Sequence, residues 1–110
     1  MILDKEGYIT TASQESSTIT VFLTNLLKGY EGLKADHLII NLFSFETLSS
    51  NDFIEFKDIS EKHKQANKSF VLVSSKISYD AIPESITVVP TLQEAKDIIA
   101  MEEIERDLGL

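Results

Sequence analysis

Two adjacent serines, Ser49 and Ser50, are the side chains best placed to do chemistry in this sequence. They follow the apolar run Leu38–Leu42, and with Asn51 and Asp52 they form a polar turn before a helical pattern. A hydroxyl at a helix start can accept a hydrogen bond from a helix amide, or it can carry a phosphate whose charge the helix dipole tolerates. The sequence leaves both interpretations open, one structural and one regulatory.

Patterns for catalysis or metal binding are sparse elsewhere in the chain. The two histidines, His37 and His63, stand apart from any spacing that binds a catalytic metal, and we expect His63 to be half-buried near the end of a helix. The four glycines form no phosphate-binding loop. The sequence contains the residue types of a catalytic triad, for example Ser50, His63 and a carboxylate. However, no serine lies in a nucleophile elbow. We therefore expect no enzymatic activity, no metal and no cofactor.

Three to four helices are expected to cover the sheet and position these residues, and the sequence pattern locates three of them. Apolar side chains at three- and four-residue spacing predict helices over residues 17–30 and 50–66, each with one buried face. A third helix should run from Thr91 to about Leu108, where Thr91 and Glu94 have the spacing of a capping box. Helices alternate with strand patterns along the chain, which indicates an α/β fold.

The strands are expected to form a mixed sheet of four or five members. The short apolar runs Leu38–Leu42 and Phe70–Val73 are typical of strands buried on both faces at a parallel centre. The segment 74–84 is polar and leaves room for a turn at most. Shorter strands are expected at residues 1–3, 7–12 and 86–89, with a turn over residues 4–7 joining the first two.

The order of residues around the serine pair carries a family resemblance. Asn41 and Leu42 end a strand, Phe45 and Leu48 are the apolar residues of the next loop, and Ser49–Asp52 opens a helix. This order resembles the Asp-Leu strand end, apolar-spaced loop and Asp-Ser-Ser-Gly turn of STAS domains, the fold of the sporulation anti-sigma factor antagonists. The resemblance covers most of residues 38–99.

The resemblance implies a function as well as a fold. Ser50 matches the serine that is phosphorylated in the antagonists, and partners of the anti-sigma or serine-kinase type would dock on Ser49, Ser50, Asn51, Asp52 and Lys57. Asp52 stands in place of the family's glycine, so it would repel a phosphate on Ser50 unless helix amides or a lysine offset that charge. STAS-like modules also serve transport systems, which leaves an accessory subunit of a transport or lipid-handling system as the alternative.

Composition narrows the class of protein. A chain of 110 residues with 43% hydrophobic residues fits one domain over residues 1–110 with a single core. The formal charge of −8 argues against a nucleic-acid partner, since binding to phosphates relies on basic residues. There is no cysteine, no apolar run long enough for a membrane span and no signal-peptide pattern at the start. We expect a cytoplasmic protein.

The last predicted helix is acidic and longer than a short strand requires. Residues 100–110 could overhang the domain. Met101, Ile104 and Leu108 would then lie beyond the sheet and would need another apolar surface to bury them. This end could fold back on its own domain, or it could contact a second copy or a partner protein. We expect Glu102, Glu103 and Glu105 at the rim of such an interface, and the lysines between residues 57 and 68 as a possible electrostatic mate.

Overall fold

Five strands form a single mixed sheet in the computed structural model, which describes residues 1–14, 18–45, 48–75 and 82–109. Their spatial order follows the sequence. β1 pairs antiparallel with β2, and the pairs β2–β3, β3–β4 and β4–β5 are parallel. The strands are β1 (Ile2–Glu6), β2 (Ile9–Ser13), β3 (His37–Asn41), β4 (Phe70–Val73) and β5 (Thr87–Val89).

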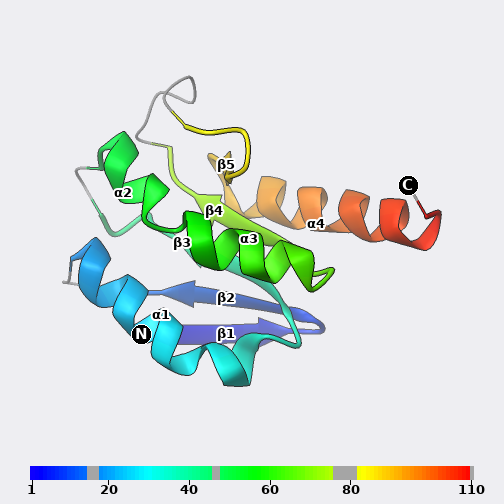
Figure 1. Ribbon diagram of the computed structural model, residues 1–110, viewed down its shortest axis with the longest axis horizontal. Coiled ribbons are helices and arrows are strands. Elements are labelled where there is room, and N and C mark those ends of the chain that lie inside the picture. Colours follow the sequence, from blue (N-terminus) through cyan, green and yellow to red (C-terminus); the bar gives the residue numbers. More distant parts are fainter. Residues whose placement is uncertain (15–17, 46–47, 76–81, 110) are drawn as a thin grey trace.

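Helices cover both faces of this sheet. Figure 1 shows the helices of residues 19–65 on one face and the helix of residues 92–107 on the other, an arrangement that matches two separate clusters of buried side chains. This α/β architecture confirms the predicted fold class of a mixed sheet covered by helices. The helices are α1 (Ile19–Leu33), α2 (Ser50–Ile54), α3 (Lys57–Gln65) and α4 (Leu92–Asp107). None of them is long and apolar enough to cross a membrane.

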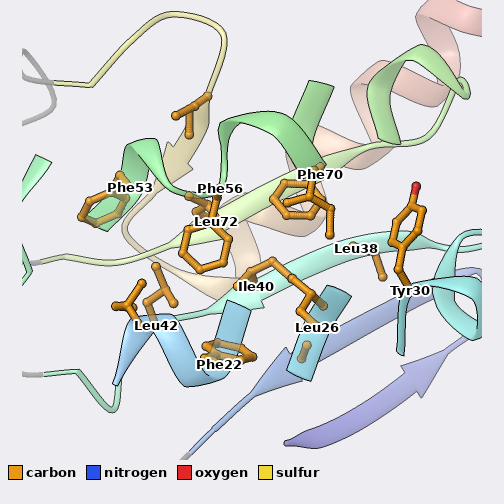
Figure 2. Packing of buried hydrophobic residues seen from close by; sticks show 14 of the residues in the cluster. Phe22, Leu26, Tyr30, Leu38, Ile40, Leu42, Phe53, Phe56, Phe70 and Leu72 are labelled. Atoms are coloured by element: carbon orange, nitrogen blue, oxygen red, sulfur yellow. The ribbon is translucent and has the colours of Figure 1, made fainter. Parts of the chain in front are cut away.

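The larger core cluster lies between the sheet and the helices α1, α2 and α3. Phe22 and Leu26 of α1 are fully buried, and Figure 2 shows them beside Ile40 of β3 in a group that also contains Phe56 and Leu72. The rings of Phe22 and Phe56 meet edge to face with centroids 6.4 Å apart, a geometry that aromatic pairs favour. This cluster holds the three helices in place on the sheet.

The first hairpin differs from the prediction. Residues 4–6 belong to β1, and the turn is the shorter pair Gly7 and Tyr8, with Glu6 paired to Ile9. Gly7 has φ of +62°, which glycine adopts at little cost. The charged residues that indicate a turn in the sequence lie instead on an exposed edge strand, where charges discourage pairing with another chain.

The single helix predicted over residues 50–66 is also wrong, because it is divided in two. α2 ends at Ile54 and α3 begins at Lys57, with Phe56 between them in an α-helical conformation but without a side-chain cap. The Phe56 amide donates to the Phe53 carbonyl at 3.1 Å, which tightens the chain at this point. Both phenylalanines are fully buried, so the chain packs against the core before the break and at the break itself.

The other helix ends agree more closely with the sequence. The Thr18 hydroxyl caps α1 by accepting from the Val21 amide at 3.2 Å, and α1 ends at Leu33 rather than at residue 30. Thr91 caps α4 by accepting from the Glu94 amide at 3.1 Å. The polar segment for which a turn is expected falls largely on residues 76–81, outside the described residues.

Candidate functional site

The start of α2 is closed by a reciprocal cap between Ser49 and Asp52. The Asp52 amide donates to the Ser49 hydroxyl oxygen at 3.4 Å, and the Ser49 amide donates to the Asp52 carboxylate at 2.8 Å. This is a capping box, which satisfies two amides that the helix leaves without partners. Ser49, rather than Ser50, is therefore the structural cap of α2.

Ser50 occupies the first position of α2 and has a different environment. Its side chain is partly exposed, and its hydroxyl makes no hydrogen bond with the described residues. A partly exposed hydroxyl without a bond to the described residues can accept a phosphate or contact a partner. The structure assigns the capping role to Ser49, and a regulatory role for Ser50 stays a prediction.

The five residues predicted to bind a partner lie along two consecutive helices. Ser49, Asn51 and Lys57 are exposed, and Ser50 and Asp52 are partly exposed. All five are carried by the segment from the cap of α2 to the first residue of α3, whose buried face is anchored in the core by phenylalanines. The result is a polar surface on a well-packed support.

The chain leaves β3 through a tight turn before it reaches this surface. The Phe43 amide donates to the Asn41 side-chain oxygen at 3.1 Å, and the Leu42 amide donates to the Val73 carbonyl at 2.9 Å. An asparagine that accepts from the amide two residues further on is a common turn former. Asn41 thus shapes the exit from the strand that the resemblance assigns to the family's Asp-Leu pair.

His63 does not take part in chemistry with Ser50. It is fully buried rather than half-buried, and both ring nitrogens are engaged: Nδ1 lies 2.7 Å from the Tyr30 hydroxyl and Nε2 lies 2.8 Å from the Asp36 carbonyl. The carbonyl can only accept, so Nε2 carries the proton and Nδ1 accepts from Tyr30. The triad of Ser50, His63 and a carboxylate is not formed, because neither nitrogen is free for the serine.

Asp36 belongs to the same buried region, at the start of β3. Its carboxylate accepts from the Thr10 hydroxyl at 2.9 Å and pairs with the Lys5 ammonium at 3.3 Å. Burial raises the pKa of Asp36, but the hydrogen bonds from Thr10 and Lys5 outweigh burial and hold the pKa below its usual value. Sequence spacing gave no sign of this cluster, since its members come from separate elements.

His37 marks a second polar cluster, where α4 meets the starts of β3 and β4. Its Nδ1 accepts from the Ser69 amide at 3.0 Å, and its Nε2 lies 2.7 Å from the Glu103 carboxylate. The Ser69 hydroxyl donates to Glu102 at 2.6 Å and accepts from Arg106 at 3.1 Å. Glu102 and Glu103 thus bond to Ser69 and His37 beside the sheet, and their place at the rim of an interface stays a prediction.

The three predicted interface residues have a different position on α4. Met101, Ile104 and Leu108 are 58%, 59% and 67% exposed, on the side of α4 away from the sheet. Within the described residues, no group of three or more histidine and acidic side chains is arranged to hold a metal ion. The surface around Ser50 and the outer side of α4 both have features that the packing of the core does not explain.

Comparison with known proteins adds information on the fold. No family model and no curated protein matches this chain. Among solved structures, the chain is similar to a serine-to-glutamate variant of RsbS from Moorella thermoacetica, with a TM-score of 0.67 and 15% identity over 91% of this chain and 94% of that chain. It is also similar to a chain in the molecular architecture of the stressosome, a signal integration and transduction hub, with a TM-score of 0.63 and 16% identity over 91% and 96% of the two chains.

These similarities span almost the whole chain and establish its fold. Together with the five-stranded mixed sheet and the position of the serine turn at the start of α2, they show that the chain has a STAS-domain fold. The resemblance in the sequence around residues 41–52 is thereby confirmed at the level of the fold.

Proposed function

We propose that this protein is a non-catalytic regulatory module that binds a protein partner through the start of α2. The docking surface comprises Ser49, Ser50, Asn51, Asp52 and Lys57. The observation that carries the proposal is the contrast between the two serines. Ser49 is committed to the cap, whereas the Ser50 hydroxyl is accessible and makes no hydrogen bond with the described residues.

Phosphorylation of Ser50 would switch this surface. The Asp52 carboxylate already places one negative charge at the start of α2, and a phosphate would add further charge beside it. A partner that docks there would have to desolvate both charges or be repelled by them, so phosphorylation should weaken binding. The fold should survive, because the Ser50 hydroxyl takes no part in the capping box.

The similar solved structures support a regulatory setting. One belongs to the stressosome, a signal integration and transduction hub, and the other is a variant in which a serine is replaced by glutamate. By analogy, the partner of this chain is an anti-sigma factor, a serine kinase or another regulatory protein, and the chain acts in the cytoplasm. This part of the proposal rests on the likeness of the fold.

A pull-down that compares wild type with Ser50→Ala and Ser50→Asp tests the proposal. We expect wild type and Ser50→Ala to recover the same regulatory protein and Ser50→Asp to recover less of it. Ser85→Asp is the matched control, since it adds the same charge at an exposed serine outside α2. Equal recovery by all four proteins would contradict a role for Ser50, and recovery of transporter subunits would favour an accessory role in transport or lipid handling.

A further inference from the structure

The helix α4 has two faces with opposite roles. Its inner face is held by the burial of Ala95 and Ile99 and by the bonds that Glu102 and Arg106 make to the Ser69 hydroxyl. Its outer face carries Met101, Ile104 and Leu108, each more than half exposed. An exposed apolar stripe of this kind on an otherwise well-packed helix commonly marks an interaction surface.

The outer face also has a consistent charge. Glu94, Asp97 and Glu105 are exposed and recur with the apolar residues at three- and four-residue spacing, so they lie on the same side of α4. The two basic residues of α4 point elsewhere, because Lys96 pairs with Glu6 at 3.3 Å and Arg106 bonds to Ser69. We define this outer face as the acidic stripe: Glu94, Asp97, Met101, Ile104, Glu105 and Leu108.

A groove extends the acidic stripe toward the edge of the sheet. It has a volume of about 240 Å³ and lies between α4 and the end of β5. Val89, Pro90, Ile98 and Met101 give it an apolar lining, and Glu94 and Asp97 line it as well. An apolar floor with carboxylates is complementary to a segment that has apolar side chains flanked by lysine or arginine.

A second copy of this chain fits the acidic stripe poorly. A symmetric contact would bring the carboxylates of two acidic stripes together, in a protein whose net charge is already −8. Two of the three lysines of α3 are already engaged with other residues of the chain. The Lys64 ammonium donates to the Ser85 carbonyl at 2.9 Å and to the Thr87 hydroxyl at 3.1 Å, and Lys62 lies over the Tyr30 ring.

We propose that the acidic stripe and its groove bind a cationic amphipathic helix of a partner protein. The apolar residues of that helix would cover Met101, Ile104 and Leu108, and its basic residues would pair with Glu94, Asp97 and Glu105. This surface lies on the face of the sheet opposite α2 (Figure 1), so it is separate from the docking surface proposed around Ser50. The two surfaces can be occupied at the same time.

The test uses the full chain and a labelled synthetic helix of about 18 residues, with leucines at the apolar heptad positions and lysines elsewhere. Fluorescence anisotropy should show binding to wild type that weakens with salt, and no binding of a peptide with glutamate in place of lysine. The triple variant Glu94→Gln, Asp97→Asn, Glu105→Gln should bind the lysine peptide at least about tenfold more weakly. The double variant Met101→Ser, Ile104→Ser should bind the lysine peptide with an affinity that is lower by a similar factor.

A charge-matched control separates this surface from general attraction to an acidic protein. The variant Asp4→Asn, Glu55→Gln, Asp58→Asn removes the same charge from exposed positions outside α4, and it should bind within about twofold of wild type. Equal weakening by both triple variants, or no binding to wild type, would overturn the proposal. So would a wild-type dimer in light scattering that dissociates on Met101→Ser, since that result assigns the acidic stripe to a second copy.

Chemical-shift mapping on the wild-type protein keeps the test independent of how the variants fold. Addition of the lysine peptide should perturb amides of α4 and β5, which border the groove. Perturbations confined to α1, α2 and α3 would contradict the proposed site. The result is distinguishable from the test of the Ser50 surface, because the peptide experiment does not involve that serine.

Discussion

The Tyr30 hydroxyl and Nδ1 of His63 lie 2.7 Å apart and join α1 to α3 inside the core. The opposite ring nitrogen of His63 donates to the Asp36 carbonyl at 2.8 Å, directly before β3. One imidazole therefore links α1, α3 and the start of β3. The rings of Tyr30 and His63 also meet edge to face, with centroids 5.5 Å apart. Because buried polar groups are costly without partners, this connection specifies how α3 sits on α1.

A double-mutant cycle should reveal strong coupling between these two residues. Tyr30→Phe removes one hydrogen bond and should lower the free energy of unfolding by about 1 kcal/mol. His63→Phe leaves both the Tyr30 hydroxyl and the Asp36 carbonyl without partners and should cost about 2–4 kcal/mol. Urea denaturation should show that the two changes differ from additivity by about 1 kcal/mol. Additive effects would mean that the hydrogen bond contributes little.

His63 should also make stability depend on pH. Burial, only partly opposed by the hydrogen bond to Asp36, lowers the pKa of His63, so the unfolded chain binds this proton more tightly than the folded chain. The folded state is therefore fully stable above pH 6.5, which is about the pKa of histidine in the unfolded chain. It loses stability as the pH falls below that value, because the unfolded chain then takes up the proton first. Between pH 7.5 and pH 5.5, wild type should lose more stability than His63→Phe, by at most about 1.4 kcal/mol per pH unit. Equal losses in urea titrations would refute this.

The buried faces of α1 and β3 can be tested by truncation. Leu26→Ala and Ile40→Ala each remove a fully buried side chain of the larger core cluster, and each should cost about 2–5 kcal/mol. Lys28→Ala is the control on the exposed side of α1 and should change stability by less than about 0.5 kcal/mol. A Leu26→Ala protein that melts at the wild-type temperature is the outcome that would contradict this packing.

The two serines at the start of α2 should differ in their effect on stability. Ser49→Ala removes the capping hydroxyl and should cost about 0.5–2 kcal/mol. Ser50→Ala removes a hydroxyl that makes no hydrogen bond with the described residues. The free energy of unfolding, measured by thermal denaturation, should therefore change by only a few tenths of a kcal/mol. If Ser50→Ala were the more destabilising change, the division of roles between the two serines would be wrong.

The strands of the core were predictable because burial leaves a simple signal in the sequence. The runs Leu38–Leu42 and Phe70–Val73 are apolar on both faces, and the structure places β3 and β4 at the centre of the sheet there. The break between α2 and α3 left no such signal. Phe53, Phe56 and Ile59 keep helical spacing across it, and neither glycine nor proline marks the interruption.

The candidate site was predictable in its position but not in its details. The sequence placed Ser49 and Ser50 at a helix start, but which of them caps depends on the backbone, and Ser49 has the extended conformation of a cap with φ of −105° and ψ of 166°. The environment of His63 depends on Tyr30, which lies 33 residues earlier in the chain. Contacts over that distance follow from the fold and not from local spacing.

The most direct test of the central claim is the affinity of the recovered partner for three forms of the chain, measured by isothermal titration calorimetry. Wild type and Ser50→Ala should bind with similar affinity, whereas Ser50→Asp should bind at least about tenfold more weakly while its circular dichroism stays unchanged. Equal affinity of Ser50→Asp and wild type, with both proteins folded, would contradict a regulatory surface at the start of α2.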